Sequence, residues 1–202
     1  MKHFDYGQKE IDYLTNCDKT LGEYIQKTGY IKRQMQGDLF ECIATSILGQ
    51  QISNKALASV VAKLKDKTEI SPQGIYALGI DEIKACGTSF RKAQNLFSLA
   101  KKVVEGTICL ESLKNQSDEQ VVKTLVSLDG VGVWTAEMAL IFSLGRQNVL
   151  SYGDFGIKKG LCLLYGLDKI DKKTFEFYRQ KFSPYCTVAS FYLWDKANKN
   201  SK

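Results

Sequence analysis

The chain has 202 residues, 44% of them hydrophobic, which is enough for one large domain or two lobes without crosslinks. No apolar run approaches the ~20 residues of a membrane-spanning helix, and the polar N-terminal segment lacks the apolar centre of a signal peptide. We therefore expect a cytoplasmic protein with no membrane partner. A net charge of +6 favours a polyanionic partner, although a lysine-rich solvated surface explains it about as well.

The six cysteines and the single histidine limit the metal and redox chemistry open to the chain. No two cysteines lie within four residues of each other, which excludes a CxxC motif and a clustered iron–sulfur ligand set. The only histidine is His3, in the N-terminal segment. We therefore expect no histidine-based catalytic or metal site.

Apolar residues recur at spacings of three and four through most of the chain, which is typical of amphipathic helices. Ser53 suits an N-cap, as does Ser117 or Asp118, and Ser183-Pro184 has the cap-then-proline order that favours a helix start. Extended segments are at most a few residues near 3–6 or 149–152. We predict an all-α protein of roughly nine or ten helices. The predicted helical segments are 8–35 (one or two helices), 39–49, 54–65, short turns and helices within 66–92, 93–104, 118–127, 133–144, 155–165, 172–182 and a last helix from 183.

The most informative stretch runs from Leu128 to Gly160. The turn Gly130-Val131-Gly132 joins two of the predicted helices, and a short loop then delivers Asp154 to the start of another. Glycines let backbone N–H groups approach a phosphate because no Cβ stands in the way. Two alternatives stay open: the turn could be an ordinary helix corner, and Asp154 could be only an N-cap.

Several segments together resemble the helix-hairpin-helix (HhH-GPD) DNA glycosylases of base excision repair, and most closely their 3-methyladenine glycosylase II (alkylpurine) branch. The resemblance rests on Gly49 to Ala56, Leu128 to Met138, Gly145 to Ile157 and Ser183 to Trp194. It implies an all-α, two-lobed fold with the active-site cleft between the lobes. It also implies a single glycosylase unit over 1–202, with the helix-hairpin-helix at about 118–145 and neither an extra N-terminal β-domain nor an iron–sulfur domain.

The resemblance implies a monofunctional enzyme that flips a 3-methyl or 7-methyl purine out of duplex DNA and hydrolyses its N-glycosidic bond. Asp154 corresponds to the catalytic aspartate, which would stabilise positive charge on the sugar and orient water. Trp134 stands where glycosylases that also cut the backbone have a Schiff-base lysine, so we expect no lyase activity at abasic (AP) sites. An aromatic face at this position would also attract a cationic base.

Three further residues are candidates for the base pocket. Trp194 would form a second aromatic wall, and Gln50, beside Gln51, lies at the helix corner that faces the site in the family. Met138 stands where the branch often has tyrosine, and its softer thioether leaves the range of bases open. The alternatives are core packing for both tryptophans and local capping for the glutamines.

The resemblance further implies double-stranded DNA containing damaged bases as the partner of a monomeric protein. Phe90 would be the wedge that fills the gap left by the flipped nucleotide, with a position in the core as its alternative. Asp129 replaces the usual hairpin proline, which removes rigidity and places a negative charge near the phosphate site. The implied DNA contacts are Gly130, Val131, Gly132, Thr135, Phe90, Arg91, Lys92 and Lys158.

No cofactor is required by this resemblance, and no iron–sulfur cluster is expected. The backbone carbonyls of Leu128 and Val131 are expected to hold a monovalent cation, Na⁺ or K⁺. Two other functions stay open: a glycosylase for oxidised or deaminated bases, and a catalytically silent helix-hairpin-helix module that only binds DNA. The pair Trp134 and Met138 argues against the first, and Asp154 argues against the second.

Overall fold

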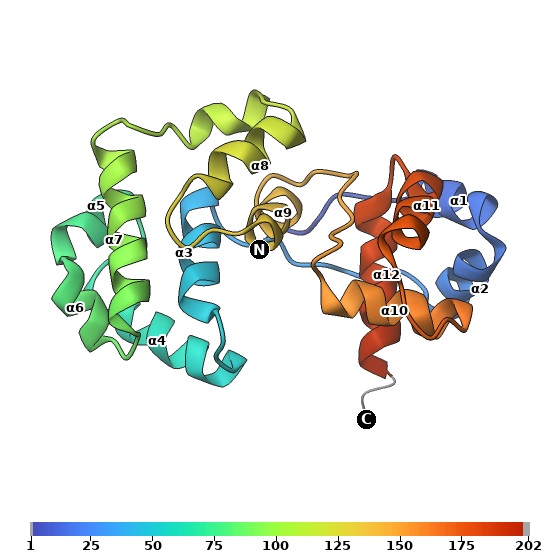
Figure 1. Ribbon diagram of the computed structural model, residues 1–202, viewed down its shortest axis with the longest axis horizontal. Coiled ribbons are helices and arrows are strands. Elements are labelled where there is room, and N and C mark those ends of the chain that lie inside the picture. Colours follow the sequence, from blue (N-terminus) through green and yellow to red (C-terminus); the bar gives the residue numbers. More distant parts are fainter. Residues whose placement is uncertain (1, 200–202) are drawn as a thin grey trace. The chain divides into compact units, whose positions relative to one another are not determined.

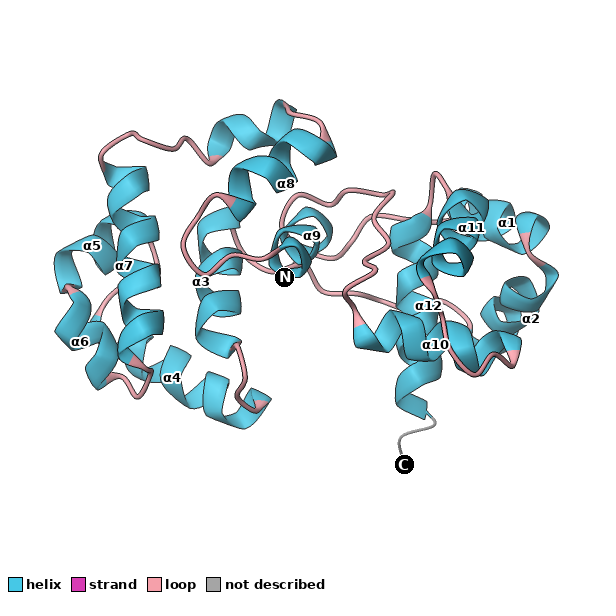
Figure 2. Cartoon of the chain, in the orientation of Figure 1, coloured by secondary structure: helices cyan, strands magenta, loops and turns pink. Residues whose placement is uncertain are grey.

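The computed structural model describes residues 2–199. These residues form twelve α-helices and one 3-10 helix, and their only strand-like feature is the isolated antiparallel bridge between His3 and Gln34 (Figures 1 and 2). The all-α prediction is confirmed, with twelve α-helices where roughly nine or ten were predicted: residues 8–35 form two, and the predicted short helices within 66–92 include α5 and α6. In chain order they are α1 (Gln8–Cys17), α2 (Lys19–Thr28), α3 (Leu39–Gly49), α4 (Asn54–Lys67), α5 (Pro72–Leu78), α6 (Ile80–Ala85), α7 (Phe90–Val104), η1 (Glu111–Asn115), α8 (Asp118–Val126), α9 (Val133–Phe142), α10 (Phe155–Tyr165), α11 (Lys172–Phe182) and α12 (Cys186–Lys199).

Most of these helices begin at a side chain that caps the first turn, where the backbone N–H groups have no partner within the helix. The predicted cap Ser53 accepts a hydrogen bond from the amide of Ala56, and Ser117 forms a reciprocal capping box with Gln120. Aspartate or serine caps seven α-helices besides the one that Ser117 caps, at Asp18, Asp38, Ser53, Ser71, Ser89, Asp154 and Asp171.

Two predicted helix starts are wrong, each for a local reason. Ser89 caps α7, so Phe90 is the first residue of that helix and not part of the loop before it. Ser183 closes α11 by donating its amide to the carbonyl of Arg179, and α12 begins only at Cys186. The order serine then proline is compatible with either end of a helix, and here it follows one.

The first of two compact units comprises residues 1–35 and 140–202. In its described part, α10 packs along α12 and α1 packs against α2. A Cβ at Gly160 would collide with the carbonyl oxygen of Leu193, so the two backbones meet directly at this glycine. This close approach places Trp194 beside the N-terminal turn of α10.

The second unit comprises residues 36–139. Helix α7 lies at its centre, with α3, α5 and α6 packed on it and α4 packed on α3. Ala93, Leu96, Leu99 and Ala100 are the buried residues of α7. The two-lobed helical fold is thus confirmed, whereas the prediction that 1–202 acts as one glycosylase unit stays a prediction. None of the described helices is long and apolar enough to cross a membrane.

Candidate functional site

Asp154 is held at the N-terminus of α10. Its backbone is extended, its Oδ1 accepts a hydrogen bond from the amide of Ile157 at 2.8 Å, and the residue is only 7% exposed. The partial positive charge of a helix N-terminus favours a negative group at this position. The N-cap role that the sequence left open is therefore confirmed, and it does not by itself exclude a chemical role.

A second donor distinguishes Asp154 from a plain cap. The indole Nε1–H of Trp194, 40 residues further along the chain, donates to the same Oδ1 at 2.9 Å. The exposed cap Asp171 needs only the amide of Thr174 to begin α11. Two N–H donors on one buried oxygen fix the orientation of the carboxylate and stabilise its negative charge.

Gly156, which the sequence analysis did not single out, lets the indole reach this carboxylate. A Cβ at position 156 would lie 2.8 Å from Cδ1 of Trp194 and 3.2 Å from Oδ1 of Asp154. Real carbon atoms do not approach this closely, so any side chain here would displace the indole. A glycine two residues after a capping aspartate is the signal that could have identified it.

The other contacts of Trp194 are aromatic and cationic. Its ring is stacked on Phe142 and Phe191, with centroids 5.8 Å and 6.1 Å away, and the guanidinium of Arg33 lies 5.2 Å from its centroid. Burial lowers the pKa of Arg33, against the smaller opposite effect of Asp195. Trp194 is therefore packed within its own unit, as the core-packing alternative expects, and Arg33 already uses its affinity for cations.

The second unit contains a hollow of about 400 Å³ that is walled by Trp134. Trp134 is 44% exposed, so core packing does not explain it. A volume of this size lies within the usual range of small-molecule sites. The other lining residues come from the chain before α3, from α3, from the corner after it and from the start of α4: Gln36, Thr45, Ser46, Gly49, Gln50, Gln51, Asn54 and Leu57.

The structure thus brings the predicted residues Trp134 and Gln50 together. Met138 is only 6% exposed and does not line this hollow, so its role as a pocket wall stays a prediction. Thr45 and Ser46 were missed, although they are small polar residues between apolar ones in the second half of α3, which is a signal for a lining role.

Gln51 has a backbone feature that its sequence does not reveal. Its φ of 58° makes it the only non-glycine residue with positive φ in the described part of the chain. This conformation is uncommon for residues with a side chain and persists where the surrounding structure requires it. The corner after α3, which lines the hollow, is therefore held at a local conformational cost.

The hairpin between α8 and α9 uses its two glycines for different reasons. Gly130 has φ +77°, and a Cβ there would collide with the side-chain amide of Asn95. Gly132 lacks a positive φ, and a Cβ there would meet no atom within 4 Å. The fold therefore requires glycine at 130, whereas at 132 the missing side chain leaves open space for an external group.

Backbone and side-chain hydrogen bonds hold the hairpin loop. The amide of Val131 donates to the carbonyl of Leu128 at 3.2 Å, and Nε2 of Gln50 donates to the carbonyl of Gly130 at 2.8 Å. The Val131 amide is therefore used inside the turn and not presented to a phosphate. A carbonyl oxygen has two lone pairs, so Leu128 retains one, and the monovalent cation expected at the carbonyls of Leu128 and Val131 stays a prediction.

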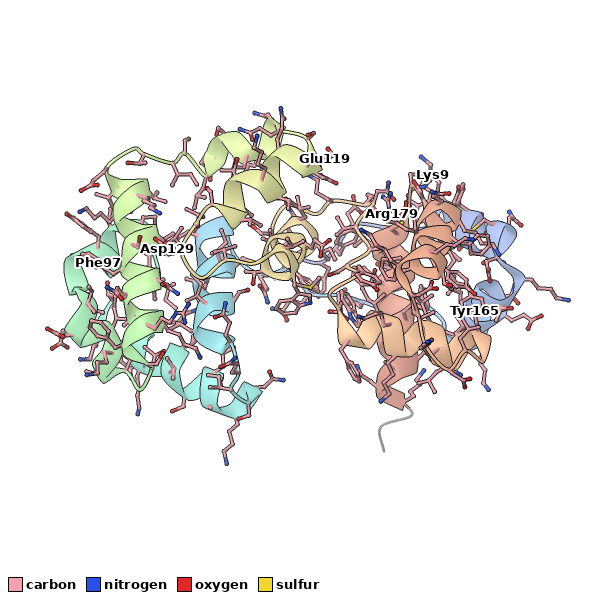
Figure 3. All side chains as sticks on the ribbon, in the orientation of Figure 1. Lys9, Phe97, Glu119, Asp129, Tyr165 and Arg179 are labelled. Carbon is pink, nitrogen blue, oxygen red and sulfur yellow. The ribbon has the colours of Figure 1, made fainter. Side chains whose placement is uncertain are left out.

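Asp129 points toward α7, as Figure 3 shows. Ser98 donates to its Oδ2 at 2.8 Å, and Nζ of Lys102 lies 3.2 Å from the same oxygen. The hydrogen bonds from Ser98 and then Lys102 lower the pKa of Asp129 below its usual value. The negative charge in the hairpin is thus paired within the protein.

The side chains of the predicted DNA contacts differ in their exposure to solvent. Phe90 is 52% exposed, so its alternative as a core residue is wrong, and Arg91 is also exposed. Thr135 is only 4% exposed, so its side chain is too buried to contact DNA at the surface. Lys158 is partly exposed, with its ammonium 4.7 Å from the ring centroid of Tyr152.

Lys92 has a contact that the sequence did not predict. Its ammonium donates to the carbonyls of Leu48 and Gln50, at the C-terminal end of α3. Burial lowers the pKa of Lys92. The charge of Lys92 therefore stabilises the corner beside the hollow, and its contact with a phosphate stays a prediction.

Within residues 2–199 no group of three or more His, Cys, Asp and Glu side chains could hold a metal ion. All six cysteines are free thiols. The expectation of a chain without an iron–sulfur cluster stays a prediction.

Comparisons with known proteins agree with the resemblance. A family model described as "HhH-GPD superfamily base excision DNA repair protein" matches residues 44–184. The DNA-3-methyladenine glycosylase 1 of Schizosaccharomyces pombe is 30% identical over 182 residues, covering 87% of this chain and 78% of that protein. A solved DNA-3-methyladenine glycosidase from Bacillus halodurans has a TM-score of 0.88 at 29% identity, over 100% of this chain and 94% of its own. The S. pombe 3-methyladenine DNA glycosylase in complex with abasic DNA has a TM-score of 0.80 at 28% identity, over 93% and 95% of the two chains.

Proposed function

The chain belongs to the HhH-GPD superfamily of base excision DNA repair proteins, and on that premise we propose that it hydrolyses the N-glycosidic bond of alkylated purines flipped out of duplex DNA. The observation that carries this proposal is the buried carboxylate of Asp154, whose Oδ1 accepts from both Ile157 and Trp194. Its substrate would be double-stranded DNA with damaged bases, and it would act as a monomer.

The proposed chemistry of Asp154 is electrostatic. Cleavage of a glycosidic bond passes through a sugar with positive charge, and a fixed carboxylate stabilises that charge without reorganising. The amide of Ile157 and the indole of Trp194 are already in place before substrate binds, so the geometry is pre-organised. Trp194 acts through Asp154 in this mechanism, as a positioning residue.

The hollow beside Trp134 would take the base. Purines methylated at N3 or N7 carry positive charge, and the face of an exposed tryptophan attracts a cation by about 0.5–2 kcal/mol. The polar residues around the hollow, including Gln50 and Ser46, can hydrogen-bond the edge of a base. Because the positive charge has already weakened the glycosidic bond, little help for the leaving group is needed.

We further propose that the enzyme is monofunctional, because Trp134 supplies no amine where a lyase needs one. Incubation with an abasic duplex and borohydride should give no covalent protein–DNA adduct on a denaturing gel. A glycosylase with a Schiff-base lysine serves as the positive control. A strong adduct with this protein would contradict the proposal.

The hairpin would hold a DNA phosphate at the first turn of α9, whose amides lack partners within the helix. A Na⁺ or K⁺ ion held by the carbonyls of Leu128 and Val131 would add positive charge to this site.

Gly132→Ala should weaken DNA binding while leaving the protein folded. The added Cβ meets no protein atom, so the destabilisation should not exceed about 1 kcal/mol, the loss expected at an N-cap glycine. A phosphate at the hairpin would be pushed away, and we expect a roughly tenfold rise in the Kd for duplex DNA. Fluorescence anisotropy and thermal unfolding measure the two quantities.

Gly7→Ala is the matched control. Gly7 is the N-cap of α1, has an extended backbone and likewise has no atom within 4 Å of a Cβ. It should show the same small stability loss with unchanged DNA affinity. If Gly132→Ala and Gly7→Ala bind DNA with the same affinity, the hairpin does not contact DNA at position 132.

The function itself is tested by incubating wild-type protein with methylated duplex DNA and separating the released bases by chromatography. We expect free 3-methyladenine and 7-methylguanine. Release from oxidised or deaminated duplexes instead would identify another lesion class. DNA binding without release of any base would leave only a DNA-binding module.

A further inference from the structure

Four polar residues of helix α7 lie close to the hairpin or to the corner after α3. Lys92, Asn95, Ser98 and Lys102 follow one another at spacings of three and four residues, which places them on one side of a helix. The buried residues Ala93, Leu96 and Ala100 lie on the neighbouring side of the helix, and the buried Leu99 lies between Lys92 and Asn95. Each of the four polar residues contacts either the hairpin or the corner that holds it.

Two of these contacts are made to Asp129, whose Oδ2 accepts from Ser98 at 2.8 Å and pairs with Lys102 at 3.2 Å. The ion pair is exposed, and exposed pairs contribute little. The hydrogen bond from the neutral hydroxyl to a charged acceptor contributes more. These two contacts lower the pKa of Asp129 below its usual value, so they favour the ionised carboxylate.

The next residue of the loop is held from two sides. The side chain of Asn95 occupies the place where a Cβ of Gly130 would stand, and Gln50 donates to the Gly130 carbonyl at 2.8 Å. Lys92 in turn binds the carbonyl of Gln50. Two successive hairpin residues are therefore attached to α7 or to a residue that α7 holds.

We propose that Asp129, Ser98 and Lys102, here called the α7 clasp, position the hairpin for phosphate binding and replace the rigidity that proline would supply at position 129. This role rests on the proposed function, because the hairpin must bind DNA for the clasp to serve it. Proline restricts the loop through its own φ angle. Asp129 restricts the loop through a side chain anchored to a packed helix, and either device lowers the ordering cost of binding.

The clasp and a simple charge effect predict opposite changes in DNA affinity when Asp129 is removed. If Asp129 only places a negative charge near a phosphate, its removal should strengthen DNA binding. If it positions the hairpin, Asp129→Ala should weaken binding despite the more positive net charge. Ser98→Ala changes no charge, so a charge effect predicts no change and the clasp predicts weaker binding.

The test uses the full chain and two readouts. The Kd is measured for a duplex with a stable abasic-site analogue at fixed salt, and hydrogen exchange is measured at the amides of residues 130–132 in the free protein. We expect both Ser98→Ala and Asp129→Ala to raise the Kd roughly fivefold and to speed exchange in the hairpin.

Matched controls come from the exposed surface of α4. Asp66→Ala changes the net charge as Asp129→Ala does, and Ser59→Ala removes an exposed helical hydroxyl as Ser98→Ala does. Neither should alter hairpin exchange or raise the Kd. Asp129→Pro should have a Kd close to that of the wild type and slower hairpin exchange than Asp129→Ala. Adding Ser98→Ala to Asp129→Pro should have no further effect.

Each remaining outcome is decisive. Unchanged hairpin exchange in Ser98→Ala and Asp129→Ala would overturn the positioning role. Faster exchange with an unchanged Kd would show a clasp that does not serve DNA binding. Tighter binding by Asp129→Ala would favour the charge effect. If the wild type bound no DNA, the proposed function would fail, while hydrogen exchange would still decide whether the clasp holds the hairpin.

Discussion

Replacing Asp154 with asparagine should reduce the rate of methylpurine release on the order of a hundredfold to a thousandfold. Asparagine removes the negative charge but retains an Oδ1 that can accept from the amide of Ile157 and the indole of Trp194. Asparagine is also a favoured N-cap, so the free energy of unfolding should change by less than about 0.5 kcal/mol. Single-turnover release of 3-methyladenine, together with denaturant unfolding, measures both effects.

Asp171→Asn is the matched control for this variant. Asp171 caps α11 through the amide of Thr174 but is exposed, so its charge serves the helix alone. It should release bases at the wild-type rate. If Asp154→Asn also releases bases at the wild-type rate, Asp154 is only a cap and the proposed mechanism is wrong.

Trp194→Phe should lower kcat for base release roughly tenfold to a hundredfold, while the KM for DNA changes little. The ring is retained, but the N–H that donates to Asp154 is lost, and hydrogen bonds to charged groups are the stronger ones. A substrate wall would behave differently, because phenylalanine still offers an aromatic face. Steady-state kinetics on the folded variant separates kcat from KM.

Gly156→Ala tests the same contact while both partners keep their identity, although its Cβ would also lie 3.2 Å from Oδ1 of Asp154. Its Cβ would stand 2.8 Å from Cδ1 of Trp194 and would push the indole away from Asp154. We expect a similar loss in kcat, and little further loss when Gly156→Ala is added to Trp194→Phe, because both changes break one interaction. Additive losses would mean that Gly156 acts through something other than the indole.

Helix positions could be predicted where their signals are local. Ser53, Ser117 and Asp154 cap helices through contacts made within three residues, so a short window of sequence contains the whole interaction. Ser183 was misplaced because serine before proline is compatible with either end of a helix. Only the packed chain shows that it ends α11.

The candidate site also combines features that the sequence indicated with contacts that only the folded chain shows. The chemistry was implied by the resemblance to the glycosylase family, whose Gly-x-Gly turn, tryptophan and aspartate positions match Gly130 to Gly132, Trp134 and Asp154 in one short stretch. The partners of those residues could not be predicted from the sequence, because they come from distant segments. Trp194 is 40 residues from Asp154, and Gln50 is 80 residues from Gly130.

Asp129 illustrates the difference most clearly. Its identity and its place in the hairpin follow from the sequence, and both suggested a flexible loop with an unfavourable charge. Its orientation depends on Ser98 and Lys102, which lie about 30 residues away on another helix. Local capping and turn preferences are decided by a residue and its near neighbours, whereas the direction of a side chain and the partner of its charge are decided by which helices pack together.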